Sequence, residues 1–215
     1  VGLNLVPEIG GVRLRRLREA FGSVQDILSA SPEHLQQVYG IGPVIAGHIA
    51  GLRPEMIDEE LQRCSPSGLT LLHCFQDSYP APLKTIYDPP LVLYVQGSLR
   101  EEDSRSLALV GSRRASVYGL ACSRQFGFEL AAAGFCVVSG MARGIDTAAH
   151  RGALEAGGRT LAVIGSGFGH LYPPENRELA EEISRSGAVV SEFPFATLPR
   201  KENFPRRNRL ISGLS

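Results

Sequence analysis

From residue 91 onward, short apolar segments alternate with longer stretches of helical character. Strands buried on both faces are apolar and rich in β-branched residues, and five segments fit this description: 91–95, 107–110, 135–139, 160–164 and 188–191. Helices are expected between them, at 118–132, 145–155 and 175–186. Helices of about ten to fifteen residues suit right-handed crossovers between parallel strands. The alternation therefore predicts an α/β fold with a doubly wound, Rossmann-like parallel sheet.

Residues 1–62 have the pattern of several short helices, and we expect them to form a small all-helical domain beside the sheet domain of residues 63–215. Residues 63–90 keep their apolar character, so they are expected to be an ordered connection. The sequence at 37–44 matches a helix-hairpin-helix turn, in which Gly40 and Gly42 shape a tight bend. Backbone N–H groups at such a turn can contact a DNA phosphate. The similar segment at 5–12 has Glu8 in place of Gly40 and would repel phosphate, so a purely structural or protein-binding module is an open alternative.

The net charge gives no indication of a partner, because 22 basic residues balance 22 acidic ones. Nothing approaches the ~18 consecutive apolar residues of a membrane span, and the N-terminus lacks the features of a signal peptide. Four cysteines without CxxC spacing argue against a zinc site and favour a reduced, cytoplasmic protein. We expect no metal and no cofactor.

The ends of the expected strands carry small residues followed by arginine. Gly111, Ser112 and Arg113 follow the second strand, and the third strand ends in Ser139 and Gly140 before Arg143 and Gly144. Ligands of such sheets bind at the carboxyl ends of the strands, where backbone N–H groups and guanidinium groups can hold an anion. The alternative is that the glycines serve tight turning alone.

Familiar catalytic and coenzyme patterns are missing. The one GxG, at Gly165, follows the fourth strand rather than the first, and neither a phosphate-binding GxxxxGK[ST] nor a GxSxG elbow is present. His150 lies four residues after Asp146 on an expected helix, which favours a hydrogen-bonded structural histidine.

The last segment combines one aromatic ring with several cations. Such mixtures bind single-stranded nucleic acid, because cations follow the phosphates and a flat ring stacks on a base. The candidate residues are Lys201, Asn203, Phe204, Arg206, Arg207, Asn208 and Arg209. In the alternative interpretation Phe204 covers the core, and one or more of the arginines pair with Glu192 or Glu202.

Several motifs together resemble the DNA-processing protein A family (DprA/Smf). They are GIG at 40–42, DSYP at 77–80, PLVLYVQG at 90–97, VGSR at 110–113, SVYG at 116–119, SGMARGID at 139–146, YP at 172–173, SEFP at 191–194 and FPRRNRLISGLS at 204–215. They cover nearly the whole chain in the family's order.

This resemblance implies a cytoplasmic, homodimeric single-stranded DNA-binding protein of bacterial natural transformation. Such proteins protect incoming DNA, load the RecA recombinase onto it and are not enzymes. The resemblance also implies a SAM-like helical N-terminal domain. It maps the family's phosphate pocket onto Gly111, Ser112, Arg113, Ser139, Gly140, Arg143, Lys201 and Asn203, with Phe204 as the base-stacking residue.

Two features depart from the family pattern, namely Glu8 and the end of the chain at Ser215, beyond which family members continue. The chain also lacks an initiator Met, so we expect a piece of a longer protein. The rival hypothesis is a Rossmann-like nucleotide-binding enzyme, similar to phosphoribohydrolases that act on nucleoside monophosphates, although their PGGxGTxxE motif is absent. A third is a protein-binding scaffold that binds DNA incidentally.

Overall fold

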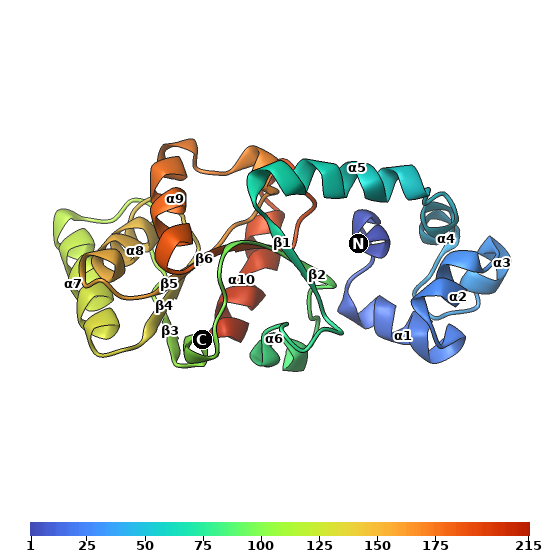
Figure 1. Cartoon of the computed structure of the whole chain (residues 1–215), viewed down its shortest axis with the longest axis horizontal. Helices are drawn as coiled ribbons and strands as arrows, with labels where there is room; N and C mark the ends of the chain where they lie inside the picture. Colours follow the sequence, from blue (N-terminus) through green and yellow to red (C-terminus); the bar gives the residue numbers. More distant parts are fainter.

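The computed structural model describes residues 1–215 (Figure 1). From residue 70 onward, the chain forms a six-stranded sheet with helices packed against it. Its strands in spatial order run β1-β2-β6-β5-β4-β3. They are β1 (Thr70–His73), β2 (Val92–Gly97), β3 (Ser106–Ala108), β4 (Cys136–Ser139), β5 (Thr160–Val163) and β6 (Ala188–Ser191). Strands β3 to β6 are parallel, as the sequence pattern predicts.

The α/β, Rossmann-like class is confirmed, with two departures at one end of the sheet. Strand β2, expected to be parallel, pairs antiparallel with both β1 and β6, and β1 was not expected as a strand. Parallel neighbours need a crossover of a dozen or more residues, usually a helix. The connection from β1 to β2 holds only the short α6 (Ala81–Thr85), and the one from β2 to β3 only a 3-10 turn at Glu101–Ser104.

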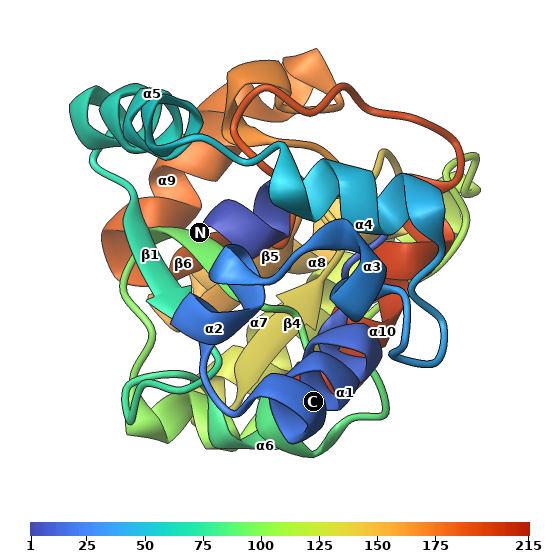
Figure 2. The ribbon, with the colours of Figure 1, turned by 90° about the vertical axis from the view of Figure 1, so that its right-hand side faces the viewer.

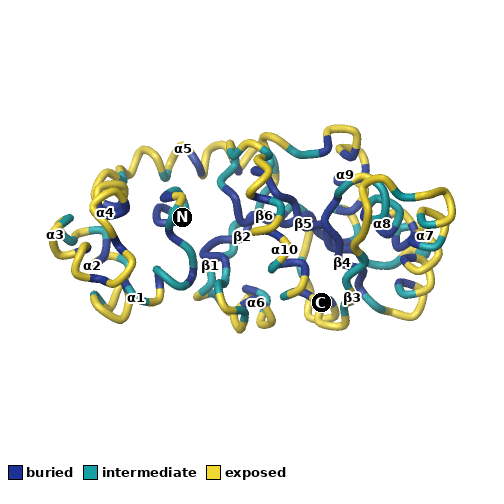
Figure 3. Tube along the Cα trace, turned by 180° about the vertical axis from the view of Figure 1, so that it is seen from behind, coloured by how far each residue is buried: buried dark blue, intermediate teal, exposed yellow.

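Helices cover both faces of the sheet. The three crossovers are α7 (Val117–Ala132), α8 (Ile145–Glu155) and α9 (Arg177–Ser186), within two residues of the expected limits. Because β3 to β6 are added in one direction, all three lie on the same face, where they pack on Val137, Ala162 and Val189. The last helix, α10 (Asn203–Leu214), and α6 cover the other face through the alternate residues Val138, Val163 and Val190. The inner strands β2, β6, β5 and β4 are accordingly buried, whereas the edge strands β1 and β3 are partly exposed (Figure 3).

Five helices precede the sheet and lie at one end of the molecule (Figures 1 and 2). They are α1 (Gly11–Phe21), α2 (Val24–Ser29), α3 (Pro32–Leu35), α4 (Pro43–Ala50) and α5 (Pro54–Cys64). The expected boundary at 62/63 thus falls inside α5. Their core includes Leu17, Ile27 and Ile49 and continues without a break onto Val92 and Tyr94 of β2. The helical segment and the sheet therefore share one hydrophobic cluster.

The hairpin between α3 and α4 has the geometry that its glycines predict. Gly40 has a φ of 88°, which a residue with a side chain rarely adopts, and Gly42 is the N-cap residue of α4. The carbonyl oxygen of Gly40 already accepts a hydrogen bond within the protein, from Arg13 Nε at 3.0 Å. The proposed backbone contact of Gly40 and Gly42 with DNA stays a prediction.

The four cysteines are free thiols. None of the helices is both long and apolar enough to cross a membrane.

His150 on α8 is a fully buried structural histidine, as its helical position predicts. Its Nδ1 lies 2.7 Å from Thr160 Oγ1, and its Nε2 has no partner. Burial, helped by the nearby charge of Arg207, lowers the pKa of His150 from 6.5 to about 3. The ring is therefore neutral in the folded protein at neutral pH.

This buried ring makes the fold sensitive to acid. As the pH falls below 6.5, the unfolded chain takes up a proton that folded His150 does not, so stability is lost between pH 6.5 and about 3. From about pH 7 to about pH 5 the loss due to His150 is about 2 kcal/mol of unfolding free energy. Urea denaturation at both pH values should show a correspondingly smaller loss in His150→Gln. Equal losses in the two proteins would contradict this assignment.

Candidate nucleic-acid interface

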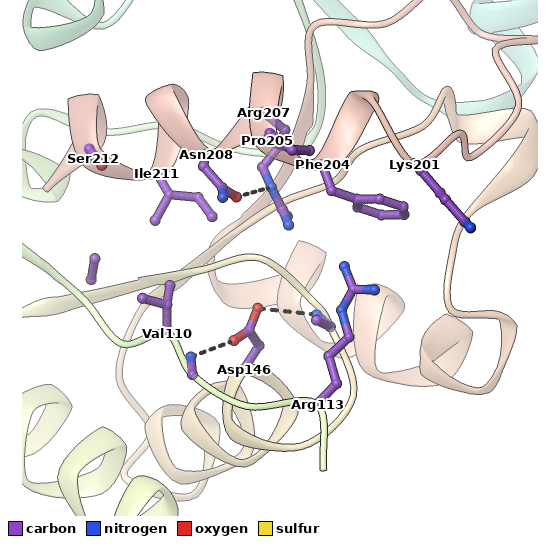
Figure 4. Close-up of a pocket in the computed structure, with 13 residues that line it drawn as sticks. Val110, Arg113, Asp146, Lys201, Phe204, Pro205, Arg207, Asn208, Ile211 and Ser212 are labelled. Carbon is purple, nitrogen blue, oxygen red and sulfur yellow. Dashed lines mark hydrogen bonds between the residues drawn. The ribbon is translucent and has the colours of Figure 1, made fainter. Parts of the chain in front are cut away.

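A cavity of about 650 Å³ opens at the carboxyl end of β3, between the start of α8 and the helix α10 (Figure 4). Its position follows from the winding of the chain. Helices α7 and α8 cover one face of the sheet and α10 covers the other, so the loop after β3 and the first turn of α10 are left apart. Ligands of open α/β sheets bind where successive connections diverge in this way. We call this cavity the strand-end pocket.

Two cations and one ring form the open part of the strand-end pocket. The guanidinium carbon of Arg113 lies 4.9 Å from the centre of the Phe204 ring, and Lys201 lies beyond that ring (Figure 4). Arg113 and Lys201 are exposed and form no ion pair, whereas Phe204 is half-buried against Gly165 and Tyr172. These are the groups that a phosphate and a base can engage without breaking an existing charge pair.

The inner wall of the pocket is closed by two buried charges. The Asp146 carboxylate accepts hydrogen bonds from the backbone N–H groups of Gly111 and Ala142, each at 3.3 Å. Arg207 donates to Gly140 O at 2.6 Å and also to Val163 O. The two charges face each other across Gly140, where an added Cβ would lie 2.6 Å from Arg207 Nη1 and 2.7 Å from Asp146 Oδ2. Any larger residue at this position would displace one or both of these charged groups.

Burial shifts both groups toward their neutral forms, and each charge opposes the shift of the other. Burial lowers the pKa of Arg207 to about 10, which leaves it charged at neutral pH. Burial also raises the pKa of Asp146, against its backbone hydrogen bonds and the charge of Arg207. In the sequence, Asp146 stands out only as a neighbour of His150 and as the last residue of the SGMARGID motif. Its position in the first turn of α8, directly after a glycine-rich strand end, is the signal for an internal carboxylate.

The structure brings six of the predicted site residues together in the strand-end pocket. They are Gly111, Arg113, Lys201, Phe204, Arg207 and Asn208. Of these, Arg207 is buried and its guanidinium donates to backbone carbonyls, so it forms part of the wall of the pocket.

Arg143 lies outside this lining. Its guanidinium pairs with the carboxylate of Glu175 and donates to Tyr172 Oη at 3.3 Å. Both side chains are about half exposed, so a phosphate can reach Arg143. Because Arg143 is already paired, the phosphate has to compete with Glu175 for it.

Arg206 and Arg209 turn to the other side of α10, toward Glu192. Arg206 lies 3.3 Å and Arg209 2.7 Å from Glu192 Oε2, and the carboxylate is buried. This confirms the alternative that one or more of these arginines fix the segment by pairing with Glu192.

The remaining predicted residues support the backbone of the site. Ser139 is buried and its hydroxyl donates to Leu109 O, while Asn203 donates to Leu198 O at 3.1 Å. Ser112 Oγ accepts from the N–H of Arg114. Gly144 has a φ of 79° and lies against the carbonyl of Ser112, so it allows the loops after β3 and β4 to meet. No cluster of three or more His, Cys, Asp or Glu side chains forms a metal site.

Replacing Arg207 is expected to destabilise the fold. Arg207→Met leaves Asp146 without its facing cation and two strand-end carbonyls without a donor, a loss of about 3–5 kcal/mol. Urea denaturation measures this effect, with the exposed Arg200→Ala as a matched control that should stay near wild type. An Arg207→Met variant as stable as the control would show that this arginine is dispensable for the fold.

Two family models match the chain. Residues 70–215 match the DNA recombination-mediator protein A model, and residues 3–51 match a helix-hairpin-helix model. Protein Smf of Synechocystis is 38% identical over 98% of the chain, which covers 54% of that protein. The chain spans about half the length of the curated relatives it matches.

Solved structures match as well. The chain superposes on DNA processing protein A from Streptococcus pneumoniae with a TM-score of 0.82 at 30% identity, over 99% of this chain and 73% of that one. A structure that concerns the single-stranded DNA binding mode of DNA processing protein A from Helicobacter pylori gives a TM-score of 0.61 at 30% identity. That match covers 68% of this chain and 66% of the other.

Proposed function

Because the chain belongs to the DNA recombination-mediator protein A family, we propose that it binds single-stranded DNA in the strand-end pocket. The observation that carries this proposal is the open group formed by Arg113, Lys201 and Phe204. Neither cation is committed to a carboxylate, and the ring lies between them. A phosphate on each cation and a base near the ring uses all three groups at once.

We extend the proposal to natural transformation of bacteria, where this protein protects incoming DNA in the cytoplasm and loads RecA onto it. The family resemblance supports this extension, and so does the homologue whose structure concerns single-stranded DNA binding. We propose that the protein acts as a homodimer. Light scattering with and without an oligonucleotide, and RecA filament assembly on coated single strands, test these two points.

We further propose that the pocket binds without catalysing a reaction. In a nucleotide-binding sheet, the backbone N–H groups at the strand ends hold the ligand's phosphate. Here Gly111 and Ala142 already donate to Asp146, an internal anion that takes the place of such a phosphate. Nucleoside monophosphates incubated with the protein should release no free base. Base release that Asp146→Asn abolishes would favour the phosphoribohydrolase alternative.

Arg113→Ala and Lys201→Ala should each weaken single-strand binding by about 1–3 kcal/mol through loss of a charge-assisted phosphate contact. Their melting temperatures should stay near wild type, because both side chains are exposed and free of ion pairs. Fluorescence anisotropy with labelled oligothymidine measures the affinity. Arg185→Ala, an exposed arginine in the last turn of α9, controls for the change in net charge. Wild-type affinity in both pocket variants would remove the pocket from consideration.

Substitutions of Phe204 distinguish stacking of its ring on a base from packing of its ring on the protein core. Phe204→Leu keeps an apolar side chain against Gly165 but loses the ring, so affinity should fall by about 1–3 kcal/mol per stacked base while the melting temperature changes little. Phe204→Tyr should retain both properties. The core-covering alternative predicts the opposite for Phe204→Leu, namely earlier melting with unchanged affinity of the folded protein.

A further inference from the structure

A second cavity, of about 670 Å³, lies on the other side of α10, between the N-terminal helices and the segment that leads into β2. We call it the hairpin groove. Its polar and aromatic lining consists of Glu8, Arg13, Arg16, Tyr39, Tyr87, Asp88 and Arg206. These residues come from α1, from the turn before α1, from the turn between α3 and α4, from the segment after α6 and from α10.

Two tyrosines of the hairpin groove are unusually exposed. Tyr39 is 82% and Tyr87 81% exposed, although large aromatic side chains usually bury most of their surface. The guanidinium carbon of Arg16 lies 4.8 Å from the centre of the Tyr39 ring. The groove thus repeats the chemistry of the strand-end pocket, where Arg113 lies over Phe204 at a similar distance.

Of the two acidic residues of the groove, Asp88 is paired with an arginine, whereas Glu8 lies beside a histidine. Glu8 lies 3.4 Å from His48 Nδ1, and Asp88 accepts from the N–H of Val12 and lies 3.6 Å from Arg209. Arg13 and Arg16, the two arginines of α1 that line the groove, face no such partner. Arg13 donates to the carbonyls of Gly40 and Glu8, and Arg16 to that of Tyr39 at 3.4 Å. These bonds to neutral carbonyls pair neither arginine with a carboxylate, and the three arginines of the lining outnumber its two carboxylates, which favours an anion in the groove.

The groove and the strand-end pocket flank the same turn of α10. Pro205 lines the pocket and the next residue, Arg206, lines the groove. A helix with its side chains is about 10–12 Å across, a distance that about three nucleotides span at the rise of 3.4 Å per nucleotide of one B-form strand. One continuous strand can therefore occupy both cavities by crossing the start of α10.

We propose that the hairpin groove is a second subsite for single-stranded DNA, in which bases stack on Tyr39 and Tyr87 and phosphates contact Arg13 and Arg16. This inference rests on the proposed function, since it extends the same strand beyond the strand-end pocket. It differs from phosphate binding by the backbone of the hairpin, because side chains of three separate segments supply the contacts. The helical segment then lengthens the binding site of the sheet.

The test is the dependence of affinity on oligonucleotide length. Labelled oligothymidines of about 4 to 16 nucleotides are titrated against wild type, Tyr87→Ala, Tyr39→Ala and Arg16→Ala. The shortest strands should bind all four proteins equally, and the longest should bind each variant about tenfold more weakly than wild type. Arg16→Ala should also reduce the slope of log affinity against log salt for the long strand by about 0.7. Arg15→Ala, an exposed arginine on the same helix but outside the groove, is the matched control.

The outcomes separate this inference from the function on which it rests. If Arg113→Ala weakens binding at every length while the groove variants match wild type, the groove is not a DNA site and the pocket stands. If Arg113→Ala and the groove variants all match wild type, both proposals fail. Tyr87→Ala guards against misfolding, because Tyr87 is exposed and forms no hydrogen bond, and melting temperatures are compared for all variants.

Discussion

The buried guanidinium of Arg207 holds the candidate site together. It joins α10 to the carbonyl of Gly140 after β4 and to that of Val163 in β5. Across Gly140, Asp146 ties the start of α8 to the loops after β3 and β4. A buried charge is tolerated only with hydrogen bonds and an opposite charge nearby. The positions of Lys201, in the turn before α10, and of Phe204, in its first turn, depend on this arrangement.

The cationic residues near α10 divide into two kinds that the sequence does not distinguish. Arg207, Arg206 and Arg209 are bound to backbone carbonyls or to Glu192, and they fix the helix to its surroundings. Arg113 and Lys201 have no such partner and remain available to a ligand. A cluster of cations in a sequence therefore overstates the number that can contact DNA. The carboxylates that the fold brings near them decide how many remain free.

The helical segment is part of the same physical unit as the sheet. Its core continues onto Val92 and Tyr94, and Glu60 of α5 accepts from the N–H of Phe195 in the segment before α10. That segment carries Lys201 and leads into Phe204. The N-terminal helices thereby hold in place the segment that carries Lys201. Their turns also line the hairpin groove on the other side of α10.

The sequence by itself determined the four parallel strands, the three crossovers and the glycine-containing hairpin, because these depend on local periodicity and on residues that permit unusual backbone angles. It also placed Arg113 at the edge of the sheet where ligands bind, since parallel strands bring their carboxyl ends to one edge. The grouping of Lys201 and Phe204 with Arg113 came from the family resemblance. The direction of β2, the pairing of Arg143 with Glu175 and the internal role of Asp146 were decided by the tertiary structure. Each depends on contacts between residues far apart in the chain. Neither the period of a strand nor the sign of a charge carries information about the partner that folding places beside it.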